Sequence, residues 1–143
     1  MAIKQLTVFV KNQKGTVVSV TDILSKNDVN LRALSIAETE DFGILRLIVN
    51  DEAKAEKVLS ENGYLIKVID VVGVKIADEP GKLTEALGVL DRANINVEYL
   101  YAFMARTEKE AYLVLRVEDE EIAETALKKA GFAMITEADV AAL

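Results

Sequence analysis

Two short segments of this 143-residue sequence have the residue types needed to bind a carboxylate through backbone groups. Lys14-Gly15-Thr16 and Pro80-Gly81-Lys82 each lie where a turn passes into a predicted apolar helix. The first turn of a helix leaves N–H groups unpaired and has a partial positive charge, so it attracts anions. A glycine at that point lets a ligand approach the backbone closely. We therefore expect ligand binding at these two segments.

The residue types available for catalysis are few. The sequence has no histidine and no cysteine, which excludes cysteine nucleophiles, disulfides, cysteine zinc sites and triads with a histidine base. Acidic clusters at 38–41 and 118–121 fall at a predicted hairpin and a predicted helix start, where solvated charge is the ordinary interpretation, and neither has calcium-loop spacing. No phosphate-binding glycine loop and no Gly-x-Ser-x-Gly motif occurs. We expect no enzyme activity, no cofactor and no metal site.

The charge and hydropathy of the chain restrict its partners. The net charge is −7, which disfavours nucleic acid and anionic membrane surfaces because both require clustered Lys and Arg. Hydrophobic residues make up 51% of the chain, enough for a folded core. No apolar run approaches the roughly 18 residues that span a bilayer, and the N-terminus lacks the apolar segment of a signal peptide. A cytoplasmic location is the resulting expectation.

The elements that position the two segments occur twice in the chain. An offset of 66 residues aligns the early parts of the two copies, and the offset becomes 68 further along. The aligned pairs include Gly15 with Gly81, Asn30 with Asn96, Asp51 with Asp119 and Gly63 with Gly131. The two extra residues lie near residues 107–110, a polar stretch where a hairpin loop absorbs an insertion. The sequence is therefore a tandem repeat.

Each copy alternates between period-two and helical apolar patterns in the order βαββαβ. The first copy has expected strands at 3–10, 31–38, 44–49 and 64–69, and the last strand of the second copy is expected at 132–136. Asp51 and Asp119 are expected N-caps, and Gly63 and Gly131 are expected to end the same helices. This order predicts an α+β fold of two ferredoxin-like units, each an antiparallel sheet with helices on one face.

The two units are expected to span residues 1–70 and 71–143. The stretch 64–76 is almost continuously apolar, so the last strand of unit one is expected to run directly into the first strand of unit two. Units joined without a linker should pack together.

The second copy resembles the ACT domain, an amino-acid-binding regulatory module. The resemblance rests on a strand at 74–77, the turn Asp78-Glu79-Pro80-Gly81, an apolar helix, and then Asn94-Ile95-Asn96-Val97. The first copy departs from the pattern by having Lys14 where the family often has proline. The resemblance covers essentially the whole chain as two copies, and the chain is similar to stand-alone tandem ACT proteins, which have no catalytic domain.

The resemblance implies a free amino acid as ligand. Units of that family commonly pair side by side into an eight-stranded sheet, with the amino acid at the interface near the first strand–helix loop. The family's loop asparagine matches Asn12, while unit two has Asp78 there. The residues expected to bind are Asn12, Gln13, Lys14, Gly15, Thr16, Asn30 and Leu31 in unit one, and Asp78, Pro80, Gly81, Lys82, Asn96 and Val97 in unit two.

The two candidate sites are expected to differ. A side-chain amide both donates and accepts, so Asn12 and Asn30 suit the two charged ends of an amino acid. Asp78 would accept from the ammonium but repel the carboxylate. We therefore expect one competent site around Asn12, Gly15 and Asn30, and one altered site.

Structural interpretations of the same residues stay open at this stage. The two glycines can simply close turns, Asn12 can form an Asx turn, and Asn30 and Asn96 can end helices in the left-handed conformation. The aromatic residues Tyr99, Tyr101 and Phe103 alternate along a strand and favour a packing surface over a ligand pocket.

Three functions remain open from the sequence. They are an amino-acid sensor without catalysis, a regulatory subunit of an amino-acid-biosynthesis enzyme, and a structural dimerisation module without ligand. A homodimer is expected because open sheet edges or an open apolar face favour self-association.

Overall fold

The structure, a computed structural model, describes residues 2–104 and 107–143. Its elements follow the repeated order that the sequence predicts, with one short helix added at the end. Their bounds are β1 Ile3–Lys11, α1 Thr16–Lys26, β2 Leu31–Glu38, β3 Phe42–Val49, α2 Glu52–Glu61, β4 Leu65–Ala77, α3 Lys82–Arg92, β5 Val97–Ala102, β6 Glu110–Val117, α4 Glu120–Lys129, β7 Ala133–Met134 and α5 Glu137–Ala142.

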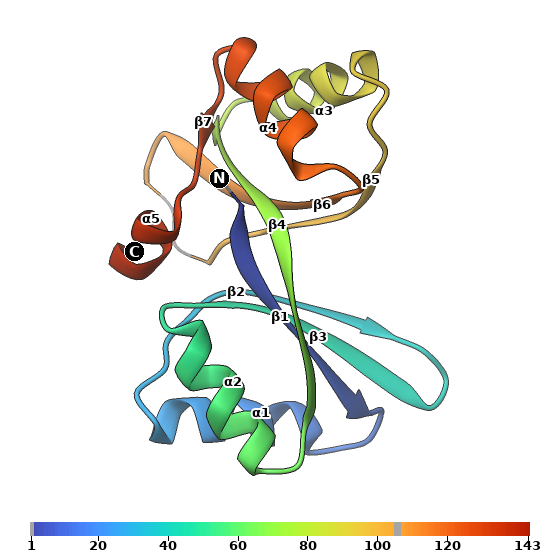
Figure 1. Ribbon diagram of the computed structural model, residues 1–143, viewed down its shortest axis with the longest axis vertical. Helices are drawn as coiled ribbons and strands as arrows, with labels where there is room; N and C mark the ends of the chain where they lie inside the picture. The colour runs from blue at the N-terminus through green and yellow to red at the C-terminus, as the bar shows by residue number, and fades with distance from the viewer. Residues whose placement is uncertain (1, 105–106) are drawn as a thin grey trace.

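Strand β4 belongs to both units (Figure 1). Its first part pairs antiparallel with β1 as far as Val71, and from Val72 onward it pairs with β6. The strand orders are therefore β2-β3-β1-β4 in unit one and β5-β6-β4-β7 in unit two, the same ferredoxin-like order twice. The expectation of a continuous strand without a linker is confirmed. The point where β4 changes its partner strand, between Val71 and Val72, lies next to the unit boundary that we propose.

Each unit has its own core between its sheet and its two helices. In unit one Leu6, Val8 and Val10 point to the helices because successive strand residues face opposite sides. Figure 1 shows α1 and α2 at one end of the molecule and α3 and α4 at the other, with the sheets between them. The molecule is thus a stack of helices, sheet, sheet and helices.

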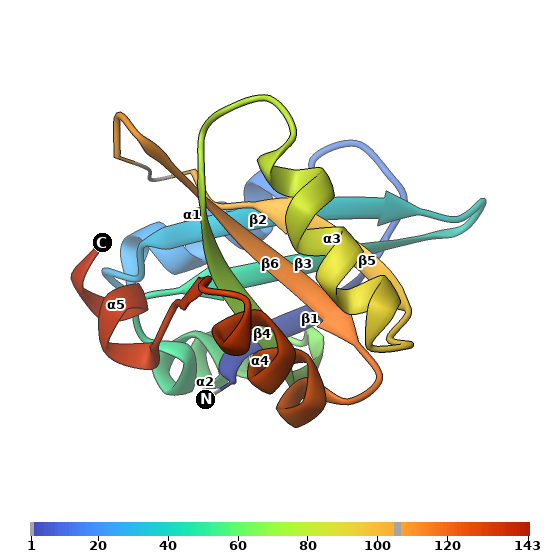
Figure 2. The ribbon, with the colours of Figure 1, turned by 90° about the horizontal axis from the view of Figure 1, so that it is seen from above.

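A third core joins the sheet faces that the helices leave uncovered. Ile3 and Ile48 of unit one meet Val114 of unit two there, and Tyr101 and Phe103 are buried in the same core. The two units of one chain therefore do not pair side by side, as the resemblance implied, because their open faces are apolar and cover each other. Figure 2, which looks down the stack, shows the strands of the two sheets crossing.

The predicted helix boundaries rest on local capping, and they are confirmed. The Asp51 side chain accepts from Lys54 N at 3.1 Å, and the Asp119 side chain accepts from Ile122 N at 3.1 Å. Gly63 and Gly131 follow the same helices with φ of 85° and 95°, values that favour glycine.

The last segment differs from the prediction. The strand expected at 132–136 is limited to Ala133–Met134, and α5 follows it. Arg32 of unit one holds α5, with Nε donating to the Val140 carbonyl and Nη2 to the Ala141 carbonyl, both at 2.9 Å. A six-residue helix depends on such tertiary contacts, which is why periodicity did not reveal it.

Among the described residues, no helix is long and apolar enough to cross a membrane.

Candidate functional site

The turn from β1 into α1 leaves the helix start without a side-chain cap. Gly15 occupies the N-cap position with φ 88°, in the left-handed region. A Cβ added to Gly15 would meet no atom within 4 Å, so glycine is needed there for its backbone angle and not for space. The first helical hydrogen bond runs from Ser19 N to the Gly15 carbonyl at 3.1 Å, so the amides of Val17 and Val18 have no carbonyl partner within the helix.

A cavity of about 490 Å³ lies against this helix start. The end of β1, the turn after it, the first turn of α1 and the turn between α2 and β4 form its walls. Its lining residues are Phe9, Val10, Lys11, Gln13, Lys14, Gly15, Thr16, Ser19, Gly63 and Tyr64. The Tyr64 hydroxyl donates to Ser19 Oγ at 2.9 Å, which fixes the far wall to the helix.

The charge of this cavity is positive in a chain of net charge −7. Lys11 and Lys14 line it, and the first turn of α1 has no acidic residue. Within residues 2–104 and 107–143, neither lysine forms an ion pair with a carboxylate. Two uncompensated ammonium groups beside an uncapped helix start suit a small anion.

Four residues expected from the sequence come together here, namely Gln13, Lys14, Gly15 and Thr16. Asn12 does not line the cavity, since its Nδ2 donates to the Thr39 carbonyl at 3.1 Å and ties the turn to the β2–β3 hairpin.

Asn30 and Leu31 lie at the opposite end of α1. Eleven helical residues separate them from Gly15, or about 16 Å along the axis. Asn30 N donates to Asn50 Oδ1 at 2.8 Å, which joins the start of β2 to the end of β3. The structure therefore does not bring Asn12, Gly15 and Asn30 into one site within a unit.

The backbone after the first helix of each unit tests whether Asn30 and Asn96 end helices in the left-handed conformation. The non-glycine residues with left-handed φ in the described chain are Asp28, at 57°, and Asn94, at 60°. The interpretation that Asn30 and Asn96 adopt this conformation is therefore wrong, because the left-handed residue lies two positions before each of these asparagines. Asn96 and Val97 follow α3 just as Asn30 and Leu31 follow α1.

Unit two repeats the backbone of the turn but not its charge. Gly81 has φ 89°, and Lys82 N donates to the Glu79 carbonyl at 3.3 Å, as Thr16 N does to the Gln13 carbonyl at 3.4 Å. The aligned positions change from Lys11 to Ala77, Asn12 to Asp78, Gln13 to Glu79, Lys14 to Pro80, Thr16 to Lys82 and Ser19 to Glu85. The Lys82 ammonium is paired with Glu85 at 3.2 Å, so this turn is electrostatically unsuited to an anion.

Sequence reasoning missed Phe9, Ser19 and Tyr64. Lys11 could have been found, since it is a second lysine next to the predicted turn. Tyr64 could not, because it comes from the α2–β4 turn and meets α1 only in the folded unit.

The described residues contain no group of His, Cys, Asp and Glu side chains that could hold a metal ion.

Comparison with known proteins agrees with this architecture. The whole chain, residues 1–143, matches the family described as ACT domain pair. The chain belongs to this family. An ACT domain pair is thus present, as the tandem repeat indicates, and its units are the two βαββαβ halves.

Several solved structures are similar to this ACT domain pair. Protein BT0572 from Bacteroides thetaiotaomicron is 36% identical, with a TM-score of 0.93 over 100% of this chain and 98% of that chain. The ligand-free regulatory subunit of aspartate kinase from Thermus thermophilus is 16% identical, with a TM-score of 0.68 over 90% of this chain and 92% of that chain. The corresponding subunit from Thermus flavus is 17% identical, with a TM-score of 0.58 over 89% and 91%.

At these identities the two kinase subunits share the fold of the ACT domain pair. No curated protein matches the sequence.

Proposed function

We propose that this ACT domain pair is a regulatory sensor that binds a free amino acid in the cavity at the start of α1 and catalyses no reaction. The observation that carries the proposal is the uncapped helix start beside Lys11 and Lys14, with no acidic residue in the first turn. The carboxylate of an amino acid would accept hydrogen bonds from the amides of Val17 and Val18.

The remaining groups of the cavity suit the other parts of an amino acid. The Gln13 amide oxygen and the Thr16 hydroxyl are acceptors for the ammonium. The ring of Tyr64 offers apolar surface to the side chain. Unit two offers the same backbone with acidic groups, so we propose one competent site per chain.

A second chain is the natural source of further ligand contacts. The cavity is open to solvent, and Asn30 lies too far from Gly15 to serve the same site in one unit. Strand β2 has β3 on one side. On its other side, the described residues 2–104 and 107–143 contribute only the Ala33–Phe103 bridge and the bond from Met104 N to the Arg32 carbonyl, so β2 is largely a sheet edge. We propose a homodimer that uses this edge and brings Asn30 or Asn96 of one chain toward the helix start of another.

An enzyme partner is the second candidate function. Its support is the fold shared over about nine-tenths of both chains with the regulatory subunit of aspartate kinase. Affinity purification from the source cells that recovers a metabolic enzyme in stoichiometric amount would favour it over a free-standing sensor.

A thermal-shift screen with the twenty amino acids, followed by calorimetry, tests the sensor proposal. A ligand that binds the folded state raises the melting temperature. Lys14→Ala should weaken binding about tenfold, the size expected for one charge-assisted contact. Lys82→Ala is the matched control in unit two and should leave binding unchanged. A melting temperature that none of the twenty amino acids raises would favour a structural module instead.

A further inference from the structure

A second cavity, of about 400 Å³, lies between the two sheets. Both units form its walls, Thr7, Arg46 and Lys67 coming from unit one and Glu98, Tyr99 and Arg116 from unit two. Its volume is within the range of small-molecule sites. We call it the inter-sheet groove.

Two cations of unit one flank the same position of the sheet on the groove side. Thr7 pairs with Arg46 of β3 on one side and with Lys67 of β4 on the other, so the three residues form one cross-strand row. Strands lie about 4.8 Å apart, so the Cα atoms of Arg46 and Lys67 are separated by about 10 Å. Both long side chains can therefore reach one group placed over Thr7.

The Arg46 guanidinium is already oriented. Its Cζ lies 3.8 Å from the centroid of the Tyr99 ring, and Tyr99 is held in turn by Gln5 Nε2, which donates to its hydroxyl at 2.9 Å. Stacking on an aromatic face leaves the N–H edge of a guanidinium available for an anion. In the part of the chain that the structure describes, neither Arg46 nor Lys67 has a carboxylate within ion-pair distance.

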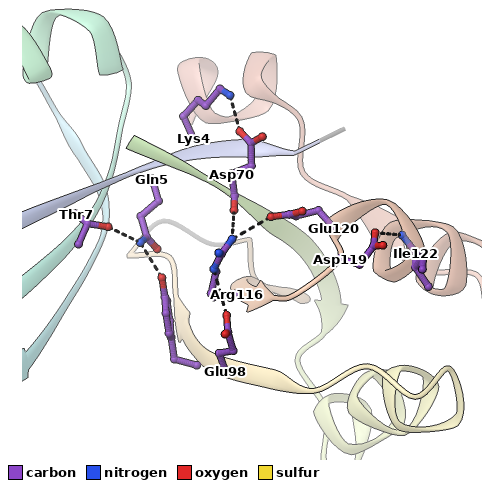
Figure 3. Close-up of polar contacts among 10 residues, drawn as sticks. Lys4, Gln5, Thr7, Asp70, Glu98, Arg116, Asp119, Glu120 and Ile122 are labelled. Carbon is purple, nitrogen blue, oxygen red and sulfur yellow. Dashed lines mark hydrogen bonds and ion pairs between the residues drawn. The ribbon is translucent and has the colours of Figure 1, made fainter. Parts of the chain in front are cut away.

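The charged groups of the opposite wall form ion pairs with one another. Arg116 contacts Glu98 at 3.2 Å, Glu120 at 3.0 Å and the Asp70 carbonyl at 3.1 Å, as Figure 3 shows. The Glu98 carboxylate in the groove is thus paired, and it does not neutralise Arg46 or Lys67.

The next row outward on the same sheet face is apolar. Leu65, Phe9 and Ile44 follow one another across β4, β1 and β3, with exposed fractions of 70% for Leu65 and 37% for Phe9. An uncompensated cationic row next to an exposed apolar row is complementary to a molecule with an anionic head and an apolar body.

We propose that the inter-sheet groove is a binding site for a small organic anion with an apolar body, its carboxylate, sulfonate or phosphate lying between Arg46 and Lys67. The apolar body lies on Phe9 and Ile44, beside the ring of Tyr99. Such a ligand contacts both units and therefore favours the relative arrangement of the two sheets that places Tyr99 over Arg46. The site is separate from the cavity at α1, with which it shares only Phe9.

Anilinonaphthalene sulfonate tests the proposal, because it joins a sulfonate to an apolar ring system and fluoresces when bound. We expect saturable binding to the full chain. Lys67→Gln should weaken it about tenfold, and Arg46→Gln by at least as much. Lys67 is exposed, so its substitution leaves the fold intact, which a thermal melt verifies. Phenylnaphthylamine, the uncharged parent compound, should not distinguish Lys67→Gln from the unchanged chain.

Two further variants locate the probe. Lys57→Gln makes the same charge change on the exposed surface of α2 and should leave the affinity unchanged. Lys14→Gln removes a cation from the cavity at α1 and should also leave it unchanged. The proposal is overturned by an absence of saturable binding, by equal effects of Lys67→Gln and Lys57→Gln, or by a loss of affinity in Lys14→Gln alone.

Discussion

The Tyr101 hydroxyl of unit two donates to Gln5 Oε1 of unit one at 2.6 Å, in the buried space between the sheets. Gln5 has no solvent exposure, and its Nε2 also donates to the Thr7 hydroxyl at 3.1 Å. Burial raises the pKa of the Tyr101 hydroxyl above its ordinary value, so the group stays protonated and remains a donor at all physiological pH values. One amide thus satisfies polar groups of both units.

Replacing Gln5 with Ala should destabilise the protein by about 3 kcal/mol, because it leaves a cavity and an unsatisfied Tyr101 hydroxyl. Urea denaturation measures the loss. Tyr101→Phe in the same background removes the orphaned hydroxyl, so the double variant should lose less than the sum of the two single variants. Additive losses would show that the two side chains are not coupled.

The aligned turns of the two units predict one ligand molecule per chain. Glu79→Gln with Glu85→Ser gives unit two the uncharged residues that unit one has at these positions and frees Lys82 from its ion pair. With the amino acid found in the screen, calorimetry should give a stoichiometry of one for the original chain and a higher value for the double variant. Two molecules bound to the original chain would contradict the asymmetry.

Substitution of alanine for Gly73 and for Gly88 should change the stability of the protein in opposite directions. A Cβ on Gly73 would lie 2.8 Å from Ile135 Cβ and 3.1 Å from Ile3 Cδ1, in the core between the sheets. Gly73→Ala should therefore cost about 1 to 3 kcal/mol through overpacking. Gly88→Ala is the control, since it lies within α3 and meets only the flexible end of Arg92, and it should stabilise by about 0.5 to 1 kcal/mol. Thermal melts that show both variants with the same sign would contradict this account of Gly73.

The docking of α5 should depend on pH through Asp139. Its carboxylate accepts from Thr136 N at 2.9 Å in a capping box and contacts Lys75 at 3.7 Å. The hydrogen bond from the Thr136 backbone, and then that from its side chain and the charge of Lys75, hold the pKa of Asp139 below its ordinary value of 3.8, against the effect of burial.

The sign of the pH effect follows from this depressed pKa. A carboxyl whose pKa is lower in the folded state stabilises the fold above its ordinary pKa of 3.8, and the contribution is lost as the pH falls through the lower, folded-state value. The amide signal of Thr136 in NMR should therefore move in acid below that ordinary pKa. Asp139→Asn keeps a hydrogen-bond acceptor but cannot titrate, so the Thr136 signal should not move with pH in this variant. If the signal moves as it does in the original chain, another group causes the effect.

The local sequence determined the two units and the ends of their helices. Alternation at Leu6, Val8 and Val10 identified a strand with one face toward helices, and Asp51 and Gly63 marked the ends of α2. These features depend on residues within a few positions of each other, so periodicity and capping preferences are enough to recognise them. The repeat also indicated that the turns at Gly15 and Gly81 share a backbone while their charges differ.

Only the tertiary structure decided how the units meet and which residues share a site. Gln5 and Tyr101 are 96 positions apart, and Arg32 and Val140 are 108 apart, so no local pattern reveals either contact. The open sheet faces are apolar, and burying them against each other removes that surface from water, which favours the face-to-face stack within the chain. That stack creates the groove beside Arg46, while the length of α1, and not the sequence motif, places Asn30 away from Gly15.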